Sequence, residues 1–188
     1  MGETMATVTQ LVTAQEFMTM DLGEGLHELV EGEVIDVPLP TPDHGRISFR
    51  SGFLLEIYGQ TTGVGYVVGN DSAILTGREP DSVRGADVAF YLSATCPREG
   101  LKAKPLEVLP ALAVEVASPG NRQGDMLDKV SEYLRAGIAN VWVIYPAKRL
   151  LIAYRSDEDD PTIRTESDPV ENVPELPGFR CVVADFFV

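Results

Sequence analysis

The sequence has few cysteines, few histidines, little positive charge and no long apolar run. Its 2 cysteines, Cys96 and Cys181, are far apart, and its 2 histidines are too few to complete a zinc site with them. The net charge of −14 excludes a globally basic surface, the usual footprint of nucleic-acid binding. No apolar run approaches the roughly 18–20 residues that cross a bilayer, and residues 1–10 lack a signal-peptide pattern. We therefore expect a cytoplasmic protein with reduced thiols and no membrane partner.

The remaining composition fits one folded domain. A chain of 188 residues with a hydrophobic share of 44% can bury a sizeable core. We expect a flexible lead over residues 1–12 and a single domain over residues 13–188. The strand, helix and strand predicted over residues 112–145 form a right-handed βαβ unit. With hairpins before and after this unit, the fold class is α/β, with a mixed β-sheet flanked by helices.

Periodicity and turn residues place the individual elements. Thr13 and Glu16 form a capping box, which predicts a short helix over residues 14–20. Thr41 followed by Pro42 predicts the start of a long helix over about residues 43–58. The remaining expected elements are strands over 26–37 (a hairpin), 65–69, 72–75, 86–91, 112–117, 140–145, 150–155 and 181–183, and a helix over 125–135.

Two of these strands carry an acid where apolar residues are expected. Alternation puts Asp87 on the face opposite Val88, and Glu115 on the face opposite Val114. Two carboxylates on neighbouring strands suit a hard divalent cation, which prefers carboxylate oxygens. The alternative is that each acid pairs with an arginine, since a lone buried carboxylate costs several kcal/mol. Arg84 and Arg122 are the nearest candidates.

The helix after Glu115 carries a third candidate. Leu127, Val130 and Leu134 follow helical spacing and are predicted to face the core. Lys129 then lies on the other stripe, where it can form a surface ion pair with Asp125 four residues before it. Alternatively, Lys129 turns back toward the Glu115 strand and stabilises negative charge there.

Several stretches together resemble the Uma-type restriction endonuclease family of the PD-(D/E)XK nuclease superfamily. The resemblance covers about residues 13–188, and its most specific part runs from Glu115 to Trp142. It rests on residues 27–33 (HELVEGE), 40–45 (PTPDHG), 86–90 (ADVAF), 112–122 (LAVEVASPGNR), 125–129 (DMLDK), Tyr133 and 137–146 (GIANVWVIYP).

The resemblance implies Asp87 and Glu115 as ligands of Mg²⁺ or Mn²⁺, and Lys129 as the catalytic lysine moved from the strand to the helix. Ala117 stands two residues after Glu115, where the superfamily motif has its lysine, so activity depends on Lys129 reaching the site. The resemblance also implies Glu28 as an additional acid of the site; the alternative is an exposed acid beside the hairpin.

His44 is a further candidate for the site, and it can equally be a polar residue of the first turn of its helix. The implied function is a metal-dependent endonuclease that hydrolyses phosphodiester bonds of nucleic acid, with DNA the expected substrate. The rival function is an inactive nuclease-like scaffold that binds another protein or itself, which the net charge favours. A nuclease cutting both strands of a duplex needs two sites, so we expect a homodimer, with the sheet edge or the strand over residues 141–145 as its surface.

Overall fold

The computed structural model describes residues 11–103, 108–118 and 123–188. Residues 1–10 of the expected flexible lead lie outside the described residues. Leu11 and Val12 already contact the fold, because the N–H of Val12 donates to the carbonyl of Gly32. The capping box at Thr13 is present, but the helix that it starts, α1 (Ala14–Phe17), is shorter than expected.

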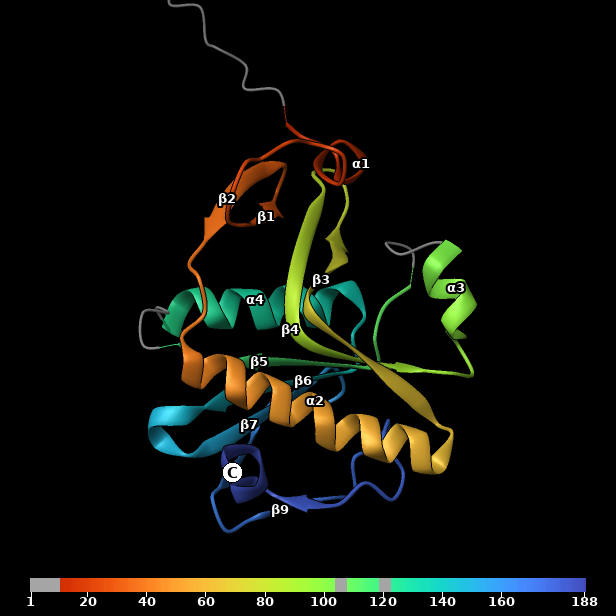
Figure 1. Ribbon diagram of the computed structural model, residues 1–188, viewed down its shortest axis with the longest axis vertical. Helices are drawn as coiled ribbons and strands as arrows, with labels where there is room; N and C mark the ends of the chain where they lie inside the picture. The colour runs from red at the N-terminus through yellow and green to blue at the C-terminus, as the bar shows by residue number, and fades with distance from the viewer. Residues whose placement is uncertain (1–10, 104–107, 119–122) are drawn as a thin grey trace, which may run out of the picture.

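A mixed sheet forms the centre of the molecule (Figure 1), as predicted. Its described strands follow the order β2-β1-β4-β5-β6-β7-β8, and β3 also pairs with β4. Their bounds are β1 (Leu26–Val30), β2 (Glu33–Val37), β3 (Gly65–Gly77), β4 (Ser82–Leu92), β5 (Leu112–Val116), β6 (Asn140–Tyr145), β7 (Leu150–Arg155) and β8 (Thr162–Thr165). Strands β5 and β6 are parallel, and the helix α4 (Gln123–Ala136) joins them in the predicted βαβ unit.

Helices cover the two faces of this sheet. The long helix α2 (Pro42–Thr62) packs on one face, together with the C-terminal segment, which holds β9 (Pro169–Val170), β10 (Cys181–Val182) and the 3-10 helix η2 (Val183–Phe187). Helix α4 covers the other face (Figure 1). The shorter elements are α3 (Arg98–Ala103) and the 3-10 turn η1 (Pro146–Lys148) between β6 and β7. Among the described residues, no helix is both long and apolar enough to cross a membrane.

Three local expectations differ from the structure. Helix α2 continues to Thr62, because the chain leaves it only at Gly63, whose φ of 71° suits a residue without a side chain. The two strands expected over residues 65–75 are one strand, β3, with a bulge at Asn70-Asp71, where both residues have positive φ. The prediction that Leu127 faces the core is wrong: it is 39% exposed, and Met126 and Tyr133 share the buried face of α4 with Val130.

Strand β4 is the element that brings distant parts of the chain together. Strand β3 pairs with β4 along the length of β4. Strand β1 pairs with the start of β4 through Leu29↔Val83, and β5 pairs with its end through Val88↔Val114. Residues of β1 therefore lie close to the residues at which β4 meets β5. The buried charged side chains of the protein lie around the place where β4 meets β5.

Candidate active site

Asp87 and Glu115 occupy neighbouring strands at the same level of the sheet. The ladder pairs Ala89 with Ala113 and Val88 with Val114, and Asp87 and Glu115 are the next residues of the two strands beyond it. The two carboxyls are close enough for the charge of Asp87 to contribute to the raised pKa of Glu115, after burial as the main cause. Both side chains are buried, with residue exposures of 8% for Asp87 and 5% for Glu115. The structure thus brings together the two predicted acids.

Neither acid pairs with Arg84, which was one of the expected alternatives. Arg84 instead donates to Glu28 at 2.9 Å and to Glu132 of α4 at 2.6 Å. The other candidate, Arg122, lies outside the described residues.

Lys129 reaches Glu115 from helix α4. Its Nζ lies 3.1 Å from each carboxylate oxygen of Glu115, 3.0 Å from Oε1 of Glu28 and 2.8 Å from the carbonyl oxygen of Gly85. The expectation of a solvated pair between Lys129 and Asp125 is therefore wrong. Burial disfavours the ammonium charge, but Glu115 and Glu28 overcome this and raise the pKa of Lys129, so it is charged.

Glu28 is a buried member of the same cluster and not an exposed strand acid. It is 7% exposed, and its Oε1 accepts a 3.0 Å hydrogen bond from the N–H of Gly85. Burial tends to raise the pKa of this carboxyl, but Lys129 and Arg84 lower it below the usual value. Glu28 therefore holds the ammonium of Lys129 together with Glu115.

Gly85 is the residue around which these contacts are built. Its N–H donates to Glu28, its carbonyl accepts from Lys129, and the bulge of β3 lies against its Cα. A Cβ at this position would lie 2.8 Å from the carbonyl oxygen of Asp71 and 2.9 Å from its Cβ. Glycine allows β4 and the bulge to approach, and it places Asp71 near Asp87.

Asp71 and Tyr133 are site residues that sequence reasoning missed. Burial, with Asp87 as the second cause, raises the pKa of Asp71. The hydroxyl of Tyr133 donates to Oε1 of Glu115 at 2.8 Å. The sequence signal for Tyr133 was its position four residues after Lys129, on the same side of α4. No local signal marks Asp71, because it reaches the site only through the bulge.

His44 also lies at the site and is more than a polar residue of a helix start. Its Nε2 is 3.1 Å from Oδ2 of Asp87, and this hydrogen bond, opposed in part by burial, raises the pKa of the imidazole. The N–H of Val116 donates to the same Oδ2 at 2.6 Å. The first turn of α2 is fixed by Thr41, whose hydroxyl accepts from the N–H of His44. His44 and Val116 therefore contact the same oxygen of Asp87, Oδ2.

The donor set of this cluster fits a divalent cation of the Mg²⁺ type. Among the described residues, no group of three or more His, Cys, Asp or Glu side chains is arranged to hold a metal. Mg²⁺ needs fewer protein ligands, because it keeps several waters and is bound through one or two carboxylates plus substrate phosphate. Burial raises the pKa of Glu115 to about 7, with Lys129 opposing the rise. A bound cation would therefore stabilise the ionised form of this carboxyl.

Fold and site together define a mixed α/β domain with a buried cluster of acidic side chains around one lysine. The Uma2 family, described as "Putative restriction endonuclease", matches residues 14–184, and the chain belongs to this family. A crystal structure described as a "putative nuclease belonging to DUF820 from Anabaena variabilis ATCC 29413" is similar with a TM-score of 0.79 and 18% identity. The match covers 94% of this chain and 97% of the other, and it confirms the predicted fold. No curated protein matches the chain.

Proposed function

We propose that the chain is a metal-dependent endonuclease that hydrolyses phosphodiester bonds of nucleic acid, with DNA as its substrate. The observation that carries the proposal is the position of Lys129. Although Ala117 replaces the lysine of the strand, the ammonium of Lys129 lies 3.1 Å from Glu115, on the strand beside that of Asp87. The membership of the chain in a nuclease-like family supports the same conclusion.

Each residue has a distinct role in this proposal. Asp87 and Glu115 would hold Mg²⁺ or Mn²⁺, which when bound neutralises phosphate charge and makes a coordinated water more acidic. Lys129 neutralises charge on the phosphate next to Glu115. Glu28 and Tyr133 are positioning residues, since Glu28 holds the ammonium of Lys129 and Tyr133 holds the carboxylate of Glu115.

His44 contacts the other acid and fixes its orientation. By donating to Oδ2 of Asp87, it keeps this carboxylate in one rotamer beside the Val116 N–H. The free, buried thiols of Cys96 and Cys181 support our further proposal that the protein works in the cytoplasm.

The test is cleavage of supercoiled and single-stranded DNA in Mn²⁺ by the parent and two variants. Asp87→Asn removes a metal ligand, and Lys129→Ala removes the ammonium. We expect the parent to cut, and each variant to lose about a hundredfold or more of the rate, the scale of losing one preorganised charge or donor. Asp125→Asn, on the exposed side of the same helix, is the matched control and should cut like the parent.

Two results would refute the proposal in different ways. Unchanged cleavage by Lys129→Ala would remove this lysine from the catalytic group. Absence of cleavage by the parent with any metal or substrate would favour the inactive scaffold, whose function is binding of another protein.

A further inference from the structure

We infer that the substrate is an unpaired nucleic-acid strand, and that two pockets on either side of His44 each hold one of its bases. The inference rests on the proposed function, because it places the phosphate between those bases at Asp87 and Glu115. Its support comes from the two cavities themselves, from their aromatic walls and from the charge of the chain.

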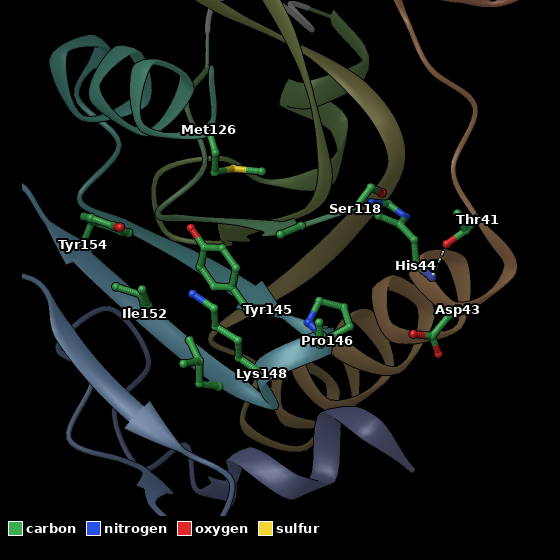
Figure 2. Close-up of a pocket in the computed structure, with 13 residues that line it drawn as sticks. Thr41, Asp43, His44, Ser118, Met126, Tyr145, Pro146, Lys148, Ile152 and Tyr154 are labelled. Carbon is green, nitrogen blue, oxygen red and sulfur yellow. Dashed lines mark hydrogen bonds between the residues drawn. The ribbon is translucent and has the colours of Figure 1, made fainter. Parts of the chain in front are cut away.

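The first pocket, which we call the tyrosine pocket, lies where β5 and β6 end. It has a volume of about 510 Å³, within the range of small-molecule sites. Figure 2 shows Tyr145 inside it, between Met126 of α4 and Lys148 of η1, with His44 and Ser118 at one side. Ala117, directly after the Glu115 strand, is also part of its wall. The pocket therefore borders the candidate active site through His44 and Ala117.

The walls of the tyrosine pocket suit a nucleobase. Tyr145 and Tyr154 offer partly exposed aromatic rings, and unstacked bases bind by stacking on such rings. The Nζ of Lys148 lies 5.8 Å from the ring centroid of Tyr145 and is in an exposed part of the chain. It can contact the phosphate of a nucleotide whose base lies on the ring.

The second pocket, which we call the phenylalanine pocket, lies on the other side of His44 and has a volume of about 520 Å³. Phe49 and Phe53 of α2 lie one above the other, with ring centroids 6.5 Å apart and ring planes inclined by 19°. Phe49 is 76% exposed, although a phenylalanine has no polar group that favours water. The guanidinium of Arg50 lies 5.5 Å from the ring centroid of Phe53 and adds a cation to this surface. The same pocket reaches Asp87.

His44 joins the two pockets to the candidate active site. It lines both of them, and its Nε2 lies 3.1 Å from Oδ2 of Asp87. A strand with one base in each pocket therefore passes its connecting phosphate across His44 toward Asp87. Bases in a duplex are stacked on each other and paired, so they cannot enter two separate pockets without being flipped out.

The charge of the chain also favours an unpaired strand over a duplex. Duplex binding derives most of its affinity from neutralising many phosphates with lysine and arginine. This chain has a net charge of −14, and the pocket walls include Asp43, Glu56 and Asp71. Stacking on aromatic rings adds affinity that does not come from neutralising phosphates, and each stacked base contributes about 1–3 kcal/mol, equivalent to roughly 5- to 150-fold in affinity.

The experiment measures binding without metal, by fluorescence anisotropy in EDTA. The three labelled probes are an oligothymidylate, its duplex with oligoadenylate, and a strand of equal length whose sites are all abasic. We expect the oligothymidylate to bind about tenfold or more tightly than either other probe. Phe49→Ala and Tyr145→Leu should each weaken its binding by about tenfold and leave binding of the abasic strand unchanged.

Ile57→Ala is the matched control, because Ile57 is an exposed apolar residue of α2, one turn beyond Phe53, and lines neither pocket. It should bind the oligothymidylate like the parent. Phe49 is exposed, so its replacement does not threaten folding, and the thermal midpoint checks that Tyr145→Leu is folded. If Phe49→Ala and Ile57→Ala instead both dissociate a dimer and leave strand binding unchanged, a second copy covers this face and the inference is overturned.

Other results distinguish failure of this inference from failure of the proposed function. No binding of the oligothymidylate, equal binding of the abasic strand, or tighter binding of the duplex would each refute the unpaired-strand substrate. Cleavage of duplex DNA in Mn²⁺ with none of these preferences would leave the endonuclease in place and remove only the base pockets. Pocket-dependent strand binding without cleavage would remove the endonuclease and leave a strand-binding protein.

Discussion

Replacing Lys129 by methionine tests the buried charge cluster most directly. Methionine keeps much of the length of the side chain and removes the ammonium, so Glu115 and Glu28 lose the Nζ contacts at 3.1 and 3.0 Å. Glu28 keeps Arg84, but Glu115 then has only the hydroxyl of Tyr133 among the contacts described above. Removing one partner of a buried ion pair typically costs about 3–5 kcal/mol, because the remaining charge is uncompensated. The pKa of Glu115 is already about 7 with Lys129 in place, so uptake of a proton by this carboxyl limits the cost in the variant. We therefore expect Lys129→Met to lower the free energy of unfolding by about 1–3 kcal/mol at neutral pH.

The measurement is urea unfolding in EDTA, with the double variant Lys129→Met, Glu115→Gln as the control. A neutral glutamine removes the uncompensated charge, so the double variant should recover most of the loss, and the resulting coupling free energy identifies the pair. Both proteins need the same urea dependence as the parent for the comparison to hold. A loss of only about 0.3–0.5 kcal/mol, the value of a solvated helix pair, would refute the reasoning and return Lys129 to the surface.

Three further predictions concern metal, backbone packing and assembly. Mn²⁺ should raise the thermal midpoint by binding the native state, and Asp87→Asn or Glu115→Gln should abolish this rise, which calorimetry measures with and without Mn²⁺. Normal Mn²⁺ binding by both variants would place the metal elsewhere. Gly85→Ala should lower the free energy of unfolding by about 1–3 kcal/mol, because the added Cβ would overlap Asp71. Gly124→Ala in α4 is the control: an added Cβ there would meet no atom within 4 Å, so this variant should be slightly more stable than the parent. Equal urea midpoints for the two variants would contradict this prediction. If the protein cuts both strands of a duplex, light scattering should give the mass of a dimer at tens of micromolar, because such a nuclease needs two sites. A monomer would refute that prediction and would agree with an unpaired-strand substrate.

The surface proposed for the dimer changes with the structure. The strand over residues 141–145 was one candidate, but Val141 to Ile144 are at most 1% exposed, because β6 lies between β5 and β7 and helices cover its faces. An interior strand cannot meet a second copy. The sheet edges at β2 and β8 remain as candidates, together with the exposed face of α2.

Local patterns were sufficient for most of the elements. The caps at Thr13 and Thr41 and the turn at Glu31-Gly32 act over a few residues, so their physical cause is visible in the sequence. The alternation in the Glu115 strand likewise predicted which face each residue takes, because strand periodicity is a property of the backbone. The predicted strands over residues 140–145 and 150–155 have the same bounds in the structure.

The charged residues of α4 show where local reasoning fails. Spacing alone put Lys129 on a solvated stripe and Leu127 in the core, and the structure reverses both positions. Assigning the faces of a helix from its pattern places charged residues toward solvent. Here Glu115 and Glu28 come from strands distant in sequence and offset the cost of burying the ammonium.

The sequence by itself therefore determined the α/β class, most element positions and the two acids on strands that become neighbours. Only the tertiary structure decided which groups meet those acids. Glu28 enters because β1 pairs with the start of β4, His44 because α2 begins beside Asp87, and Asp71 because Gly85 admits the β3 bulge. Those contacts depend on strand order and on close approach of separate backbones, and neither is encoded in the spacing of neighbouring residues.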